Sequence, residues 1–222
     1  MLIVRVDTGE EEMCKMLRML GNDGERVLKN AINRTARKSR KTTAKQAEKR
    51  YDYEEKANFL NEMKLRTAKK VAYGSMMAEI SAKGPVNEIK QFTVDNMTVS
   101  RGKNRPDAVR GKVMTASGMT ELKRKGIKAF VAQFRSGHIA VVAREELSSE
   151  QKEKGHHNGK SYKYENYRLK KLLSPSVPQM LGHKESLNEV VEPEIRDLLV
   201  KNVERQFAMI MKKKTKTGTL ID

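Results

Sequence analysis

Four histidines and a few paired carboxylates are the side chains with which this chain could do acid–base or metal chemistry. His156 and His157 are adjacent, so on a strand they point to opposite sides and cannot converge on one metal ion. His138 stands in "RSGH" (135–138), a predicted hairpin turn in which Gly137 supplies positive φ. No Ser, Cys or Asp partner occurs at a readable spacing from His138. We therefore expect its ring to hydrogen-bond across the turn rather than to act as a general base.

Two further patterns resemble functional motifs, a phosphate-binding loop and paired catalytic carboxylates, but neither meets the requirements of its chemistry. The segment "GHHNGKS" (155–161) resembles a phosphate-binding P-loop. It is one residue shorter than G-x-x-x-x-G-K-[ST], and a shorter loop cannot wrap a phosphate with its backbone N–H groups. The pairs Glu54–Glu55 and Glu145–Glu146 lack the apolar surroundings that would shift a pKa. We expect no catalytic site, no cofactor, no metal site and no enzymatic activity.

Charge is the strongest signal in the composition. The chain has 46 Lys and Arg residues against 28 Asp and Glu residues, a formal net charge of +18. A charge of this size repels itself, which indicates a polyanionic partner or a neutralising neighbour in an assembly. Nucleic acid is the first candidate, an acidic protein surface the second and an anionic membrane a distant third. Zinc-finger, helix-turn-helix and aromatic RNA-binding signatures are absent from the sequence, so contact with phosphates without base readout remains.

Much of this charge lies in one amphipathic segment, residues 24–51. Ten cations occur from Arg26 to Arg50, and the acids in this neighbourhood are Glu25 and Glu48. Apolar and small residues recur at steps of three and four, and a second, basic stripe lies about two-thirds of a turn away. The first stripe is Leu28, Ile32, Thr35, Ala36, Ser39, Thr43 and Ala47, and the second is Arg34, Lys38, Lys41, Lys45 and Lys49. The pattern predicts a long helix packed by its small residues; the alternative is a solvated charged face without a partner.

Other elements must position this helix. "LIVRV" (2–6) predicts a strand, and Thr8 with Glu11 a capping box before a helix that carries Met13, Met16, Leu17 and Leu20. Short alternating segments from 64 to 144 predict a meander of antiparallel strands, including 96–101, interrupted by a basic loop at 101–112. Residues 145–161 are predicted to form a polar loop insertion.

The last part, 172–213, predicts a proline-containing connector and a C-terminal helix. Pro175 and Pro178 are expected to keep the connector extended. Ser186 with Glu189 predicts a capping box, and Pro193 is expected to kink the helix or to lie near its first turn. The apolar stripe of this helix is Ile195, Leu198, Leu199, Val203, Phe207 and Ile210. Together the segments predict one α+β domain over 1–222, with N-terminal helices (1–60), a central antiparallel sheet and a C-terminal helix.

The chain offers little sign of export. Its single cysteine, Cys14, allows no disulfide within the chain and is expected to be a small core residue. The N-terminal segment turns acidic too early for a signal peptide, and no run approaches the ~18 apolar residues of a membrane span. We expect a soluble intracellular product without membrane contact.

Three segments resemble one protein family. They are "LKNAINRTARKSRKTTAKQ" (28–46), "FVAQFRSGHIAVVAR" (130–144) and "LLSPSVPQMLG" (172–182). In the same order and at similar spacing, they resemble the minor tail protein Z and tail-completion proteins of long-tailed bacteriophages and prophages. In the second segment Ala140 and Val142 stand where the family more often has a glycine and an aromatic residue. The resemblance covers most of residues 25–210 and is weakest in the 145–161 insertion.

The resemblance implies a structural virion protein without enzymatic activity. It would act in the neck, at the head-proximal end of the tail, as a homo-oligomeric ring, most often sixfold, around the DNA channel. Its neighbours would be the tail terminator, the tail tube, the head–tail connector and the packaged DNA. The residues expected to contact DNA or an acidic neighbour are Arg34, Arg37, Lys38, Lys41, Lys45, Lys103 and Arg105. The alternative is a free-standing cytoplasmic protein that binds nucleic acid without sequence preference.

Overall fold

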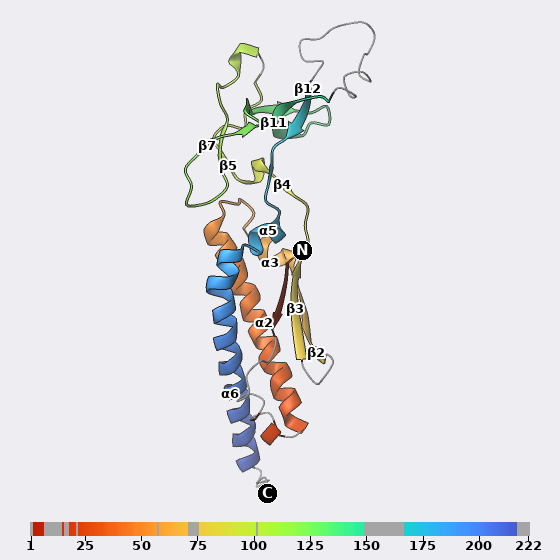
Figure 1. The fold of residues 1–222 in the computed structure, drawn as a ribbon, viewed down its shortest axis with the longest axis vertical. Coiled ribbons are helices and arrows are strands. Elements are labelled where there is room, and N and C mark those ends of the chain that lie inside the picture. The colour runs from red at the N-terminus through yellow and green to blue at the C-terminus, as the bar shows by residue number, and fades with distance from the viewer. Residues whose placement is uncertain are drawn as a thin grey trace. The chain divides into compact units, whose positions relative to one another are not determined.

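The computed structural model of the chain describes residues 2–6, 15, 18–20, 22–56, 58–70, 76–100, 102–148 and 167–216. They fall into two units. Unit 1 comprises Met1–Glu48, Ala57–Gly84 and Val177–Asp222, and unit 2 comprises Lys49–Lys56 and Pro85–Ser176. Two long helices and several small antiparallel sheets make the fold α+β, as the sequence predicts (Figure 1). The β-rich stretch expected at 64–144 is divided between the two units.

Unit 1 is built on two long helices, α2 (Asn22–Arg50) and α6 (Glu192–Lys216). The helix predicted at 24–51 is therefore confirmed, shifted by one or two residues at each end. Hydrogen bonds join Thr35 to Asn202 and Thr42 to Glu194. The residue number therefore rises along α2 while it falls along α6. The helices thus run antiparallel, side by side (Figure 1). Acidic residues stand in the first turn of each helix, where they are favourable to the helix dipole.

A three-stranded antiparallel sheet completes unit 1. Its order is β1 (Leu2–Val6), β3 (Met76–Ala82), β2 (Met63–Lys70), so the N-terminal strand pairs with the third strand of the chain. The register of β2 on β3 shifts between Arg66 and Lys69, and the backbone N–H of Ala68 in this bulge donates to Asn33 Oδ1 of α2 at 2.7 Å. A side chain of α2 thereby satisfies a donor that the bulge removes from the ladder.

One hydrophobic core joins the two helices and the sheet. α2 contributes Val27, Leu28, Ala31, Ile32 and Ala36; α6 contributes Ile195, Leu199, Val203 and Ile210; the sheet contributes Ala68, Met76 and Ala78. These positions confirm most of the predicted C-terminal stripe, while Leu198 and Phe207 are half-buried. Leu20 is the described one of the four apolar residues named for the first predicted helix, and it is also buried in this core. Alanine side chains are small, so the alanines of α2 allow a short distance between its backbone and the neighbouring elements.

The chain enters α6 through two short helical segments. Pro178 is the second residue of α5 (Val177–Leu181), so the expected extended connector is wrong at this position, because proline is compatible with a first helical turn. The segment Ser186–Val191 is a π-helix, and Glu185 before it already has helical dihedral angles. Ser186 therefore does not begin the helix, and the capping box predicted there is wrong. Pro193 is the second residue of α6, and the π-helix leads into it without a break, because Glu192 also has helical dihedral angles.

Unit 2 consists of small sheets. β5 (Thr93–Val94), β6 (Arg110–Lys112) and β7 (Thr120–Glu121) form one, β8 (Lys123–Arg124) pairs with β9 (Ile127–Lys128), and β4 (Asn87–Glu88) pairs with β13 (Leu173–Ser174). The 3-10 turns η2 (Ile89–Gln91) and η3 (Gly102–Asn104) lie between them in sequence. The predicted loop 101–112 thus ends in strand β6, whereas residues 96–100, predicted to form a strand, form none.

The principal sheet of unit 2 has the order β10 (Phe130–Gln133), β11 (Ile139–Glu146), β12 (Tyr167–Lys171). The predicted hairpin joins β10 and β11, and Gly137 adopts φ 84° in its turn. Val141 and Ala143 pack into a core with Ile89, Val109 and Leu172, while Ala140 and Val142 pack with Phe130 on the opposite face. β11 is therefore buried on both faces, which its unbroken apolar run explains.

The predicted insertion 145–161 begins later than expected, because Glu145 and Glu146 are the last residues of β11. Residues 149–161, with the P-loop-like segment and both adjacent histidines, lie outside the described residues. So do the Thr8–Glu11 capping box, Met13, Met16, Leu17 and Cys14.

Candidate functional site

Five predicted contact residues project from one side of α2. Arg34, Arg37, Lys38, Lys41 and Lys45 are all exposed, and we call them the α2 basic row. They span twelve residues, and the eleven steps between the first and the last cover about 16 Å of helix at 1.5 Å per residue. The opposite side of α2 is buried as predicted, with Ile32, Thr35, Ala36, Ser39 and Thr43 each at most 3% exposed. The row is therefore held on a helix that is anchored along its length.

The polar members of the buried side are all hydrogen-bonded. Ser39 Oγ donates to the carbonyl of Thr35 at 2.9 Å, and Thr43 Oγ1 donates to the carbonyl of Ser39 at 3.0 Å. Asn202 Nδ2 of α6 donates to Thr35 Oγ1 at 3.0 Å. A buried hydroxyl without such a partner would cost about 1–3 kcal/mol. Serine and threonine thus give α2 a shallow packing surface whose hydroxyls all have a hydrogen-bond partner, one of them on α6.

The row carries little countercharge. Among the described residues one ion pair reaches it, Lys38 Nζ to Glu194 Oε1 at 3.9 Å, with the Lys38 side chain 57% exposed. A pair this long and this exposed contributes about 0–1 kcal/mol. In the part of the chain that the structure describes, Arg34, Arg37, Lys41 and Lys45 form no ion pair. Their mutual repulsion is tolerated because each head group is solvated and screened.

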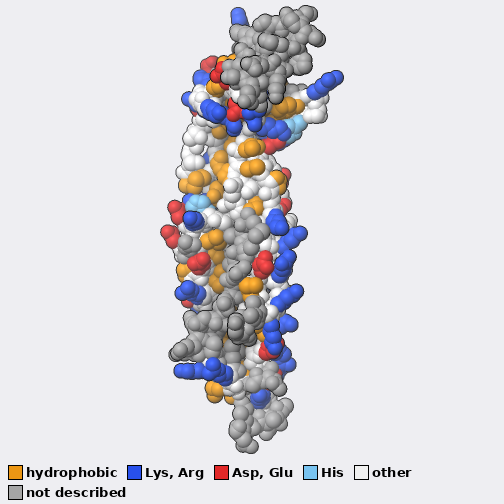
Figure 2. Space-filling model, turned by 45° about the vertical axis from the view of Figure 1, so that its right-hand side comes forward, with side chains coloured by type: hydrophobic (Ala, Val, Ile, Leu, Met, Phe, Trp, Pro, Cys, Tyr) orange, Lys and Arg blue, Asp and Glu red, His pale blue; other side chains and the backbone are white. Residues whose placement is uncertain are grey.

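Cations also gather visibly at the surface of the molecule. Figure 2 shows Lys and Arg side chains in a line along the right-hand edge of the lower part of the view, with few Asp or Glu side chains among them. Ordinary exposed helices alternate charges to gain favourable pairs three or four residues apart. α2 has ten cations and three acids, whereas α6 has seven cations and four acids. Of these two helices, α2 has the larger excess of positive charge.

The other two predicted contact residues, Lys103 and Arg105, belong to unit 2. Lys103 is exposed within η3. Arg105 is half-buried: its Nε donates to the carbonyl of Ser100 at 3.2 Å, and its guanidinium lies 4.2 Å from the centre of the Phe130 ring. The structure therefore gives Arg105 a fixed position against an aromatic ring, which a loop assignment did not predict.

A second group of cations surrounds the buried carboxylate of Glu145 near the end of β11. Arg124 Nη2 lies 3.2 Å from Glu145 Oε1, Arg168 Nη2 lies 3.0 Å from Oε2, and Lys125 and Lys170 lie within 4 Å. We call these five residues the Glu145 cluster. Hydrogen bonding from Arg124, then from Arg168, lowers the pKa of Glu145 to about 2 against the opposing effect of burial. The expectation from the sequence concerns only apolar surroundings as a cause of a shifted pKa, whereas cations that are far away in sequence and close in space lower this one.

A third group surrounds Glu88 of β4. Lys171 Nζ donates to Glu88 Oε1 at 2.6 Å, and His138 Nε2 lies 2.9 Å from Oε2. Burial acts to raise the pKa of Glu88, but the hydrogen bonds from Lys171 and His138 outweigh it and hold the pKa below its ordinary value. The ring of His138 thus binds a carboxylate fifty residues away, and the bond expected across the turn is made by the backbone instead.

Neither carboxylate group has the organisation of a catalytic site. In each group the cations pair with the central carboxylate, and neither group places a general base beside a nucleophile. Within the described residues, no group of three His, Cys, Asp or Glu side chains is placed to hold a metal ion. None of the described helices is long and apolar enough to cross a membrane. Comparison of the chain with protein-family models, with curated proteins and with solved structures finds no match.

Proposed function

We propose that the protein is a structural component of a phage or prophage tail, acting at the head-proximal neck as a tail-completion or head–tail joining protein. In this role several copies form a ring around the DNA channel, and the α2 basic row contacts the DNA backbone. The ring adjoins the tail terminator, the tail tube and the head–tail connector. The role itself comes from the resemblance of residues 28–46, 130–144 and 172–182 to the minor tail protein Z family.

The observation that carries the proposal is the α2 basic row itself. Four of its five cations form no ion pair with a described residue, and the helix beneath them is locked by buried small residues. Duplex DNA presents about one phosphate charge per 1.7 Å of its axis, so a row about 16 Å long faces several phosphates. Contacts of this kind release counterions and carry no sequence information.

The exposure of the α2 basic row determines how strongly it would hold DNA. Because each head group is solvated, each contact is weak and screened by salt. DNA held by many weak contacts from a ring stays in place, yet it can slide when it is ejected. A deeply buried or base-specific site would hold one sequence in one register, which a channel must avoid.

The salt dependence of DNA binding tests this proposal. The purified chain and its Arg34→Gln/Lys38→Gln/Lys41→Gln variant are titrated with a labelled duplex at several salt concentrations. Five phosphate contacts per subunit give a slope of log K against log salt near −4.5, and the variant lowers this magnitude by about 2.7. A Lys64→Gln/Arg66→Gln/Lys69→Gln variant, which removes three exposed cations from β2 of the same unit, serves as the charge-matched control. Equal slopes for the row variant and the control would contradict the DNA contact.

A neighbouring acidic ring is the other outcome that this test can reveal. In that case the row variant leaves the DNA slope unchanged and instead weakens co-purification with tail or head structures. Electron microscopy of lysates from a phage that lacks this chain, complemented with either form, provides the assembly readout. Separate heads and tails in the absence of the chain support the neck role, and normal joined particles would contradict it.

A further inference from the structure

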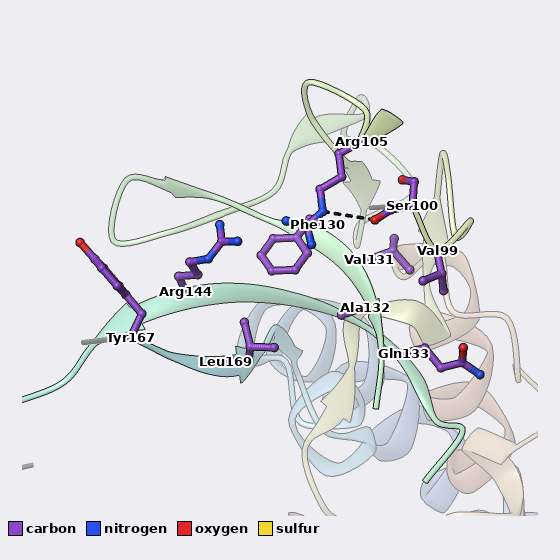
Figure 3. A pocket seen from close by; sticks show the side chains of 10 residues that line it. All are labelled: Val99, Ser100, Arg105, Phe130, Val131, Ala132, Gln133, Arg144, Tyr167 and Leu169. Carbon is purple, nitrogen blue, oxygen red and sulfur yellow. Dashed lines mark hydrogen bonds between the residues drawn. The ribbon is translucent and has the colours of Figure 1, made fainter. Parts of the chain in front are cut away.

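A cavity of about 300 Å³ lies on the face of the β10–β11–β12 sheet that carries Phe130 in unit 2 (Figure 3). The strand register explains which side chains meet there. Phe130 lies opposite Val142, and Arg144 lies opposite Leu169, so the alternating side chains of all three strands reach the same face. Tyr167 is two residues before Leu169 and joins this face, while Val99, Ser100 and Arg105 reach it from the preceding segment.

Two guanidinium groups converge on one aromatic ring in this cavity. The Cζ of Arg105 lies 4.2 Å from the centre of Phe130, and the Cζ of Arg144 lies 4.9 Å from it. In Figure 3 the Phe130 ring lies between the two arginines, and the bond from Arg105 to Ser100 fixes the first of them. The electron-rich ring face stabilises each cation. Since Phe130 is only 8% exposed, a ligand meets the guanidiniums rather than the ring.

The walls of the cavity add an apolar surface to this charge. Tyr167 is 41% exposed and Leu169 is 46% exposed, although both are large side chains on a sheet face. None of the ten described residues that line the cavity is acidic. The nearest acid along β11 on this face is Glu146, which lies opposite Tyr167. The site therefore offers cationic planes beside an exposed aromatic ring.

We propose that this cavity binds one unstacked nucleotide of single-stranded nucleic acid. The base stacks on Tyr167 and on a guanidinium plane, and the adjoining phosphates pair with Arg105 and Arg144. Stacking of bases on aromatic rings and on arginine planes is the usual way in which proteins hold single strands. A volume of about 300 Å³ is at the small end of ligand pockets, which suits a single nucleotide and not a duplex. Lys103, exposed two residues from Arg105, extends the positive surface toward the next phosphate.

This inference does not depend on the neck role or on the α2 basic row. Duplex DNA on α2 is a backbone contact, whereas a nucleotide in the cavity is a base contact. The two are separated by working in the Arg34→Gln/Lys38→Gln/Lys41→Gln background. There the contribution of α2 is reduced, and the further loss of single-strand binding on substitution of Tyr167 or Arg105 reports on the cavity.

The test is equilibrium binding of a labelled dT8 oligonucleotide, followed by fluorescence anisotropy at about 0.1 M and 0.5 M salt. Tyr167→Ala is expected to weaken binding roughly fivefold or more at both salt concentrations, because stacking is not screened. Tyr167→Phe retains the ring and is expected to retain the affinity. Arg105→Gln is expected to weaken binding mainly at low salt, whereas Arg110→Gln, an exposed arginine of the same unit outside the cavity, is the matched control. Glu146→Gln removes a negative charge beside Tyr167 and is expected to strengthen binding.

An abasic oligonucleotide of the same length decides between the base and the backbone. Binding at least fivefold weaker than that of dT8 supports the proposal. Equal binding of the two oligonucleotides, or equal affinity of Tyr167→Ala and the parent, would overturn it. A peptide with one phenylalanine among glutamates is the competitor; if it binds through Tyr167 more tightly than dT8, the site takes an acidic protein segment and the proposal fails. Far-UV circular dichroism and thermal unfolding verify that each variant is folded.

Discussion

The α2 basic row and the Glu145 cluster are both dense groups of cations, but they are built in opposite ways. Around Glu145 four cations approach one buried carboxylate within 4 Å, and that carboxylate has its pKa lowered to about 2. On α2 only Lys38 of the five exposed cations pairs with a described carboxylate, at 3.9 Å from Glu194. The first group satisfies a charge that the fold has buried. The second group leaves its charge to solvent and to whatever binds there.

The difference shows that the cations behind the net charge of +18 do not all have the same role. Cations that face a buried carboxylate serve the stability of unit 2 and are poorly available to a partner. Cations on α2 add nothing comparable to stability, because the packing of α2 depends on its other side. Substitutions in the two groups should therefore separate stability from binding, and four predictions follow this separation from the largest effect to the smallest.

Charge reversal of the row should have the largest effect. Arg34→Glu/Lys38→Glu/Lys41→Glu removes three favourable phosphate contacts and adds three repulsive ones, so DNA affinity should fall by at least 10² at about 0.1 M salt. Head–tail joining in complemented particles should fail for the same reason. Thermal unfolding should change by no more than a few degrees, because all three side chains are exposed. Fully infectious particles would contradict the DNA-facing assignment.

Glu145→Gln should give the opposite result, loss of stability with unchanged DNA binding. The pKa of Glu145 lies below that of the unfolded chain, so its carboxylate stabilises the fold fully above about pH 4.5. This contribution is lost as the pH falls through about 2. Thermal unfolding midpoints measured from pH 7 to pH 2 should be lower for the variant by several degrees at pH 7, and the two curves should approach each other toward pH 2. Parallel curves would show that Glu145 does not carry the charge coupling.

Asn202→Ala tests how α2 is anchored. The substitution removes the bond to Thr35 Oγ1 and leaves a buried hydroxyl with one partner fewer. Unit 1 should lose about 1–2 kcal/mol of unfolding free energy, measured by urea titration, with unchanged affinity for duplex DNA. Thr35→Val/Asn202→Ala is the control, since removing both partners should cost less than the sum of the single changes. Additive losses would show that the two side chains do not interact.

Single substitutions within the row should give the smallest effect and the finest comparison. Lys41 forms no ion pair with a described residue, whereas Lys38 Nζ lies 3.9 Å from Glu194 Oε1. Lys41→Gln should lower DNA affinity roughly fivefold to tenfold at about 0.1 M salt, and Lys38→Gln should lower it less because Glu194 already offsets part of its charge. Glu194→Gln should raise the affinity slightly. Equal losses at Lys38 and Lys41 would show that Glu194 does not tune the row.

The long helix and its two sides are what the sequence predicts best. A period of 3.6 over more than twenty residues is a strong local signal, and every residue of the predicted small-residue stripe is buried. The hairpin around Gly137 is equally local, because its turn needs a positive φ that glycine adopts readily. The strand at 2–6 is also confirmed, although its partner β3 lies more than seventy residues away.

The charge clusters could not be found in this way. Glu145 meets Arg124 and Arg168, which lie 21 and 23 residues from it, and Glu88 meets Lys171 at a separation of 83 residues. Such contacts follow from how strands pair, and no local period records them. The same holds for Arg105, which the sequence indicates only as a basic loop residue and which the fold places over Phe130. Pro178 failed as a predictor of extended chain because the first turn of a helix accepts proline as readily as a connector does.

A cryo-electron microscopy map of the assembled neck tests the central claim most directly. The account predicts that α2 of each subunit turns Arg34, Arg37, Lys38, Lys41 and Lys45 toward the DNA in the channel, with phosphate density within reach of these side chains. A map in which this side of α2 meets only open solvent, while the DNA passes other surfaces, would contradict the account.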